Sequence, residues 1–253
     1  MTRIANIAGF MMAAIAACAG AVSPVLATTV TPVVIDLQSS GRGVVSNISV
    51  NNSGATALPM EVSVQPLEPT DTGLVAKGED TGDLLVVPPT AIIPPGQTQT
   101  FRVQWVGDPD LAASKHFYAS VGQLPVKLPE GQSAVQIVYN FQVLVNVSAP
   151  NQEDSLTIRS ASIGDHDGKP APVITVENSG RAHGYLSQHR LKIVEKDDAG
   201  AEIFSKMLSG GEFQQVVGYG LIASGQVRTL MLPIDLPSRT GHLSVTLLDE
   251  QQQ

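Results

Sequence analysis

The chain has 253 residues and a formal net charge of −8 at pH 7, with 15 Lys and Arg against 23 Asp and Glu. Hydrophobic residues make up 43% of the sequence, enough for a buried core, which excludes a disordered tail. The acidic balance argues against a nucleic-acid-binding protein, which normally carries a basic surface. The single cysteine excludes an internal disulfide framework and a cysteine-rich zinc module.

Residues 1–27 have the features of a secretory signal peptide. Arg3 supplies a positive start, residues 4–22 are almost all small or apolar, and Val25-Leu26-Ala27 fits a cleavage site. We therefore expect this segment to direct export and to be removed. Two alternatives stay open: a retained membrane helix, and lipidation at Cys18, which ends a short motif resembling a lipoprotein box.

Residues 28–150 predict an immunoglobulin-like β-sandwich. Short runs rich in Val, Ile and Thr are separated by Gly, Pro, Asn and Asp at fairly regular intervals, and no helix is expected among them. Pro32, Pro59 and Pro66 fall at strand ends or edges, where a missing N–H is tolerated. The expected strands are Thr29–Leu37, Val44–Asn51, Met60–Gln65, Leu84–Val87, Thr98–Val106, His116–Leu124 and Val135–Val147.

Residues 151–253 predict a second β-sandwich domain. Ser148-Ala149-Pro150-Asn151 breaks the strand pattern, and turn signals at residues 164–168 and 197–200 separate the later strands. The expected strands are Leu156–Ile163, Pro172–Glu177, Tyr185–Val194, Gln226–Leu232 and His242–Leu248. The fold class is therefore all-β, and the short junction indicates two sandwich domains held at an angle.

The segment Val135–Val147 is the most informative of these strands. Its odd-numbered residues are apolar, whereas most of its even-numbered residues are Gln or Asn, so a strand here has one apolar and one polar face. At about 3.3 Å per residue it would span roughly 43 Å, more than a sandwich core needs. One interpretation is a long core strand; the other is an exposed edge kept for a partner.

Several segments, in their order and spacing, resemble the periplasmic chaperones of the chaperone–usher pathway, which assemble pili and fimbriae. The Gln-Leu-Pro-Val ending at residues 123–126 is closest to the archaic branch of that family. The long alternating strand also lies where the family has its donor strand. The other segments that carry the resemblance are Val87–Val103, Phe117–Val126, Val176–His183 and Leu221–Arg228.

The resemblance implies two sandwiches in a boomerang and a periplasmic location. It implies that the chain lends a strand to an incomplete pilin subunit and delivers that subunit to an outer-membrane usher. The donor residues would be Val135, Ile137, Tyr139 and Phe141. It implies no catalysis, cofactor, metal, nucleic acid or small-molecule substrate.

One feature of the family is missing from this sequence. Well-studied members hold the terminal carboxylate of the pilin with two basic residues, and the matching positions fall near Ile35 and Leu144. A substitute anchor is expected from Arg102 and Lys115, the basic residues on nearby strands. The alternatives are a structural ion pair for Arg102 and a solvated strand position for Lys115.

Other motifs give little chemistry. Asp165-His166-Asp167 lies between glycines and predicts a turn rather than a metal loop. Ser209-Gly210-Gly211 is not expected to be a nucleophile elbow, because no helix is expected after it. An alternative function is a structural or adhesive surface sandwich, itself a pilus component, although Thr28 leads into strand residues almost at once. An enzyme has almost no support.

Overall fold

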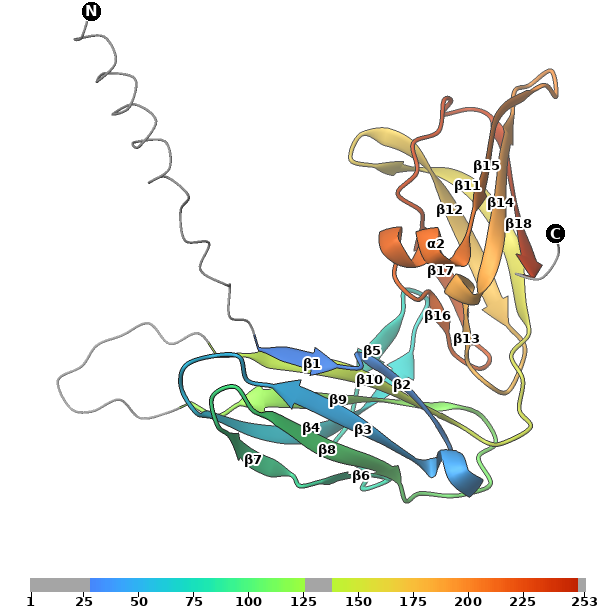
Figure 1. The fold of residues 1–253 in the computed structure, drawn as a ribbon. Helices are drawn as coiled ribbons and strands as arrows, with labels where there is room; N and C mark the ends of the chain where they lie inside the picture. Colours follow the sequence, from blue (N-terminus) through green and yellow to red (C-terminus); the bar gives the residue numbers. More distant parts are fainter. Residues whose placement is uncertain (1–27, 126–137, 250–253) are drawn as a thin grey trace, which may run out of the picture.

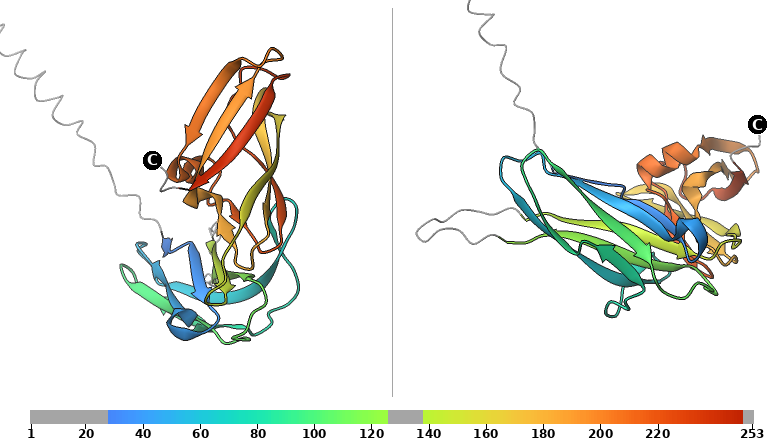
Figure 2. Two further views of the ribbon diagram at one scale, coloured as in Figure 1. Left: turned by 90° about the vertical axis from the view of Figure 1, so that its right-hand side faces the viewer. Right: turned by 60° about the horizontal axis from the view of Figure 1, so that its bottom comes forward.

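The structure is a computed structural model that describes residues 28–125 and 138–249. Two β-sandwiches stand at an angle to each other, and the second rises from one end of the first (Figure 1). The same angle is visible from two further directions (Figure 2). The all-β class with two immunoglobulin-like sandwiches is therefore confirmed. The predicted signal peptide at residues 1–27 lies outside the described residues, and the domain limits 28–150 and 151–253 stay predictions.

The first sandwich consists of two facing sheets. One sheet has the strand order β1-β3-β8-β6. The other has the order β2-β10-β9-β4-β5, with β7 also paired to β4. The bounds are β1 (Thr29–Thr31), β2 (Val34–Gln38), β3 (Val45–Asn51), β4 (Leu58–Pro69), β5 (Leu74–Ala76), β6 (Leu84–Val87), β7 (Thr90–Ile93), β8 (Thr98–Trp105), β9 (Lys115–Gln123) and β10 (Asn140–Ser148), with a 3₁₀ turn at Gly41–Val44.

The core of the first sandwich reflects period-two alternation. Along β10, Val143, Val145 and Val147 are fully buried, and they meet Phe101 and Phe117 from the strands β8 and β9. Side chains of one parity therefore form the core, as the sequence predicts. Burying each such valine contributes about 1.5–3 kcal/mol, so the strand is fixed firmly wherever this alternation holds.

The expected strand Thr29–Leu37 is in fact two strands in different sheets. β1 pairs with β3, whereas β2 pairs in parallel with β10. The chain crosses between the sheets at Pro32, which has no N–H to donate to either ladder and lies after a cis peptide bond. This crossing decides which part of β10 receives a neighbour.

The second sandwich has smaller sheets around a separate core. The sheets have the orders β11-β12-β17, β13-β16 and β15-β14-β18. Its core gathers Ile174, Leu191, Ile193, Phe213 and Leu232, all fully buried. The bounds are β11 (Leu156–His166), β12 (Lys169–Asn178), β13 (Gly184–Tyr185), β14 (His189–Lys196), β15 (Glu202–Leu208), β16 (Leu221–Ile222), β17 (Val227–Met231) and β18 (His242–Asp249), with a 3₁₀ turn at Leu186–Gln188.

The expectation that no helix comes after Ser209-Gly210-Gly211 is wrong. The helix α2 (Gly210–Val216) begins there with a capping box, in which Ser209 Oγ accepts from the Glu212 N–H and the Glu212 carboxylate accepts from the Ser209 N–H. Phe213 anchors the helix in the second core. The Ser209 hydroxyl also donates to Glu212 Oε2 at 2.7 Å, so this side chain is held by the cap.

Among the described residues, no helix is long and apolar enough to cross a membrane.

Candidate functional site

The two edges of β10 are not covered equally. On one side β9 pairs with residues 140–147 of the strand, from Asn140 opposite Gly122 to Val147 opposite Lys115. On the other side the pairing with β2 begins only at Leu144 of β10, which lies opposite Val34, the first residue of β2. The Leu144 N–H donates to the Val33 carbonyl at 3.0 Å. Within the described part of the chain, residues 140–143 therefore have one edge paired and one edge open.

The backbone direction shows which groups this open edge offers. The Tyr139 carbonyl accepts from the Gln123 N–H, so odd-numbered residues direct their backbone groups toward β9. Leu144 directs its N–H to the opposite side, toward β2. Because this direction alternates along an antiparallel pair, Asn140 and Gln142 face the open edge with their N–H and C=O groups. An incoming strand would bond to these four groups.

Of the four predicted donor residues, Tyr139 and Phe141 lie within the described residues. Val135 and Ile137 lie outside the described residues. Tyr139 is 36% exposed, and its ring stacks on Phe141 with centroids 5.9 Å apart. Phe141 is half-buried against the first core. Phe141 is therefore shared with the chain's own core, whereas Tyr139 presents apolar surface to solvent.

The half of β10 that pairs with β2, residues 144–148, takes part in a polar contact between the sandwiches. Asn146 is fully buried, and its amide nitrogen donates to Asp36 Oδ1 at 3.1 Å and lies 2.7 Å from the Tyr185 hydroxyl. The Tyr185 hydroxyl donates to Asp36 Oδ1 at 2.6 Å, and His183 Nε2 lies 3.0 Å from the same oxygen. His116 Nδ1 lies 2.7 Å from Asn146 Oδ1. We call these five residues the hinge cluster.

Burial and hydrogen bonding act differently on the members of the hinge cluster. Burial works to raise the pKa of Asp36, but the bonds from His183, Tyr185 and Asn146 outweigh it and lower that pKa. Burial lowers the pKa of His116 to about 4, although its bond to Asn146 acts in the opposite direction. Burial beside Asp36 raises the pKa of Tyr185. At neutral pH the cluster therefore holds an ionised Asp36, a neutral His116 and a neutral Tyr185.

A second contact between the sandwiches comes from the β4–β5 hairpin. Its tip lies against β17, where the Thr229 N–H donates to the Asp71 carbonyl at 2.8 Å. Gln226 Nε2 donates to the Thr70 and Gly73 carbonyls, and Arg228 Nε donates to the Thr72 carbonyl at 3.1 Å. The hairpin thus bonds to the second sandwich at a site separate from the hinge cluster, so the two domains are held at more than one place.

Arg102 and Lys115 lie on different sheets. Arg102 is an exposed residue of β8. Lys115 lies on β9, where its ammonium pairs with Asp83 at 2.9 Å and sits 5.6 Å from the centroid of the Trp105 ring. No contact joins the two basic residues within the described ranges. A shared role as a carboxylate anchor stays a prediction, and Lys115 would have to give up Asp83 to take it.

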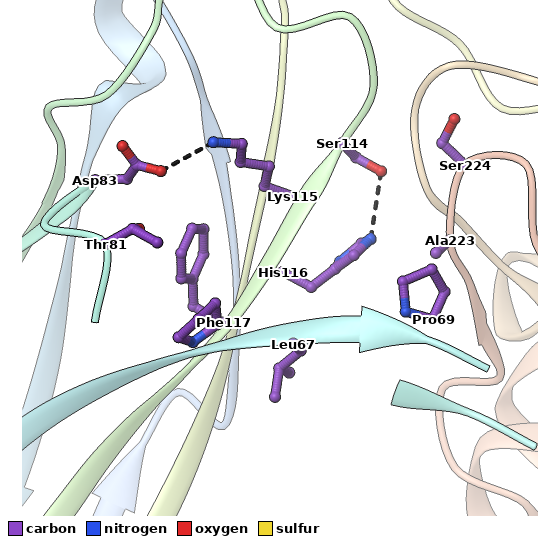
Figure 3. Close-up of a pocket in the computed structure, with 11 residues that line it drawn as sticks. Leu67, Pro69, Thr81, Asp83, Ser114, Lys115, His116, Phe117, Ala223 and Ser224 are labelled. Atoms are coloured by element: carbon purple, nitrogen blue, oxygen red, sulfur yellow. Dashed lines mark hydrogen bonds and ion pairs between the residues drawn. The ribbon is translucent and has the colours of Figure 1, made fainter. Parts of the chain in front are cut away.

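Lys115 also lines a cavity of about 230 Å³ between the sandwiches (Figure 3). The first sandwich contributes Phe117, Leu67 and Pro69 to the wall, and the second contributes Ala223 and Ser224. Ser114 Oγ lies 3.4 Å from His116 Nε2 at the same wall. His116, a member of the hinge cluster, also lines this cavity.

Sequence reasoning did not find the hinge cluster. Asn146 has the parity of the polar face, as expected, but the second sandwich covers it. In the sequence, the two basic residues with which well-studied family members hold the pilin carboxylate correspond to positions near Ile35 and Leu144. Ile35 faces the core and is 4% exposed. The available signal was the polar Asp36 within a valine- and isoleucine-rich strand, because such a residue needs partners once it is covered.

The comparisons with known proteins agree with this geometry. A chain of a chaperone–tip adhesin complex of CFA/I fimbriae matches with a TM-score of 0.52 and 13% identity, over 90% of this chain and 94% of that chain. A chain of the CsuC–CsuE chaperone–tip adhesion subunit pre-assembly complex, from the archaic chaperone–usher Csu pili of Acinetobacter baumannii, matches with a TM-score of 0.51 and 11% identity. That match covers 87% of this chain and 97% of the other.

The class 5 fimbriae chaperone CfaA matches with a TM-score of 0.50 and 13% identity, over 88% of this chain and 99% of that chain. No family model and no curated protein matches the sequence. The chain therefore has the fold of chaperone–usher pilus chaperones, and the resemblance seen in its sequence is confirmed at the level of the fold.

Proposed function

We propose that the chain is a periplasmic chaperone for pilus or fimbrial subunits. It binds a subunit that lacks one strand, completes the subunit's sandwich with its own β10 region, and delivers it to an outer-membrane usher. Residues 1–27 direct its export and are removed. The fold it shares with pilus chaperones supports this role, and the open edge of β10 at residues 140–143 is the observation that carries it.

The backbone and the apolar side chains of the donor segment would contribute differently to the binding of a subunit. Each backbone bond that Asn140 and Gln142 make to an incoming strand contributes about 0.5–1.5 kcal/mol. Each of the side chains Val135, Ile137 and Tyr139 contributes about 1.5–3 kcal/mol when a subunit buries it. The apolar side chains therefore supply most of the affinity, whereas the backbone bonds fix the register.

The same edge is a place where another chain can pair with β10. An unpaired strand edge next to apolar side chains favours pairing with other chains, and proteins normally block such edges. Here Asn140 and Gln142 leave the edge open, and Val138 beside them is 50% exposed. A subunit that occupies this edge covers its unpaired groups and its apolar side chains together.

The test replaces apolar donor residues with aspartate. Tagged protein is first purified from its native periplasm, and the bound chain is identified and co-expressed. The double variant Ile137→Asp, Tyr139→Asp should fold but lose capture of that subunit, because two charges cannot enter an apolar groove. The matched control is Gln136→Asp, Asn140→Asp, which adds the same charge at the opposite parity and should keep most of the capture.

Normal capture by the Ile137→Asp, Tyr139→Asp variant would refute the donor assignment. Equal loss in both double variants would show that charge alone weakens binding, whichever face carries it. If the purified wild-type protein instead polymerised with itself on gel filtration, the chain would be a pilus component rather than a chaperone.

A further inference from the structure

A pocket lies between the sandwiches where the open edge of β10 ends. It has a volume of about 290 Å³. Val34, at its wall, is the residue of β2 that pairs with Leu144 and closes the edge. A strand bound along residues 140–143 would therefore reach this pocket with its next residues. The lining residues are Val34, Asp36, Tyr185, Ser187, Gln188, Gln214 and Tyr219.

The carboxylate of Asp36 lines the pocket and gives it a negative charge. Its Oδ1 atom takes the contacts from Tyr185, His183 and Asn146. Within the described part of the chain no contact is found for Oδ2, and half of the side chain's surface is exposed. The carboxylate is therefore held in one orientation by Oδ1 while Oδ2 can still accept a hydrogen bond. Its lowered pKa keeps it ionised at neutral pH.

The other lining groups also suit a cation. No Lys, Arg or His lines this pocket among the described residues. The rings of Tyr185 and Tyr219 lie with centroids 5.9 Å apart, and tyrosine faces attract ammonium and guanidinium groups. The side chains of Ser187, Gln188 and Gln214 add oxygens that can accept hydrogen bonds. A carboxylate entering here would be repelled by Asp36.

We propose that this pocket binds a cationic side chain, an ammonium or guanidinium group, of the subunit held on β10. The proposal rests on the proposed function for the identity of the partner. It assigns the region between the domains the charge opposite to that of the two-base carboxylate anchor that the family resemblance implies. The subunit is then fixed by an apolar strand contact and, beyond the end of the open edge, by a charge-assisted contact with Asp36.

The first experiment uses the free protein and no subunit. Methylguanidinium chloride is titrated into the protein and followed by NMR, with sodium acetate and potassium chloride as comparisons. Methylguanidinium should produce saturable shifts at Tyr185 and Tyr219, whereas the two other salts should not. The variant Gln214→Lys, on an exposed position of α2, places a competing ammonium at the pocket.

Gln214→Lys should weaken methylguanidinium binding by about tenfold to a hundredfold, the effect expected when a charge-assisted bond is blocked. Gln214→Glu, the matched control, should bind at least as tightly as the wild type. Asp36→Asn, which keeps an oxygen for Tyr185 but removes the charge, should also weaken binding by at least tenfold. Equal binding in all four proteins, or tighter binding of acetate, would overturn the cation site.

The second experiment asks whether the subunit uses the pocket. Gln214→Lys should reduce capture of the co-expressed subunit several-fold, whereas Gln214→Glu should not. If Gln214→Lys loses methylguanidinium but captures the subunit normally, the assignment of a subunit cation to the pocket is wrong. If the wild type captures no subunit at all, the proposed chaperone function fails, and the methylguanidinium result still decides whether the pocket binds cations.

Discussion

The two halves of β10 belong to one strand but have opposite surroundings. From Leu144 onward the strand has β9 on one edge and β2 on the other, and the second sandwich covers Asn146. From Asn140 to Val143 only β9 is paired, among the residues that the structure describes. The closed half therefore contributes stability to the fold, whereas the open half is available to a partner.

The difference originates in β2 rather than in β10. Pro32 ends the pairing of β1 with one sheet, and the chain then crosses to the other sheet, where β2 begins at Val34. A β2 that began earlier on this sheet would have closed the edge. The length of the open half is thus set by where the first strand changes sheets.

The largest expected effect is a difference in the free energy of unfolding between a variant in the closed half of β10 and a variant in the open half. Val145→Ala, in the closed half, removes two fully buried methyl groups and should lower the free energy of unfolding by about 2–3 kcal/mol. Tyr139→Ala, in the open half, should lower it by less than about 0.5 kcal/mol, as usual for surface positions. Urea unfolding of both variants measures the contrast. Equal losses would mean that Tyr139 belongs to the core.

The next effect is a pH dependence of the closed half. His116 has a pKa near 6.5 when unfolded and about 4 when folded, so the unfolded chain binds the proton more readily. Stability should therefore fall as the pH drops from 6.5 to 4, by at most about 1.4 kcal/mol per pH unit. Asp36, whose pKa is lowered, adds its loss only below its unfolded value of 3.8.

The measurement is the urea midpoint between pH 7 and pH 4. His116→Gln, which can still bond to Asn146, should flatten the slope in this range. His183 and Asp36 face His116 within the hinge cluster and remain in that variant. An unchanged slope would assign the pH dependence to another group.

The smallest effect concerns the backbone of the open half. Gln142→Pro removes an N–H that faces the open edge and leaves the bonds to β9 in place. It should weaken subunit capture by about twofold to tenfold, the value of one hydrogen bond. Gln142→Val controls for the loss of the side chain and should bind as the wild type does. Full capture by Gln142→Pro would show that the subunit does not pair with this residue.

Much of the fold could be predicted from the sequence because period-two alternation and turn residues are local signals. They gave β6 with its observed bounds, and the centres of β3, β8, β9 and β12. Weak alternation hid β15, in which only Leu208 is buried. The helix α2 was missed although Ser209 and Glu212 form a recognisable capping pair.

The site was only partly predictable, for a different reason. Apolar residues of one parity in β10 mark a strand with a usable face, and this is visible in the sequence. Whether an edge is open depends on where β2 starts, and the hinge cluster joins Asp36, Asn146 and Tyr185 across long sequence separations. Such pairings arise from the packing of two domains. A local pattern can mark Asp36 as a polar residue that needs partners, but it does not say which residues those partners are.

Hydrogen exchange at individual amides tests the central claim most directly. In the free protein the Gln142 amide should exchange quickly, because it faces an open edge, whereas the Leu144 amide, bonded to Val33, should be protected. In the subunit complex both amides should be protected. A Gln142 amide that is already protected in the free, monomeric protein, or that stays unprotected in the complex, would contradict the account.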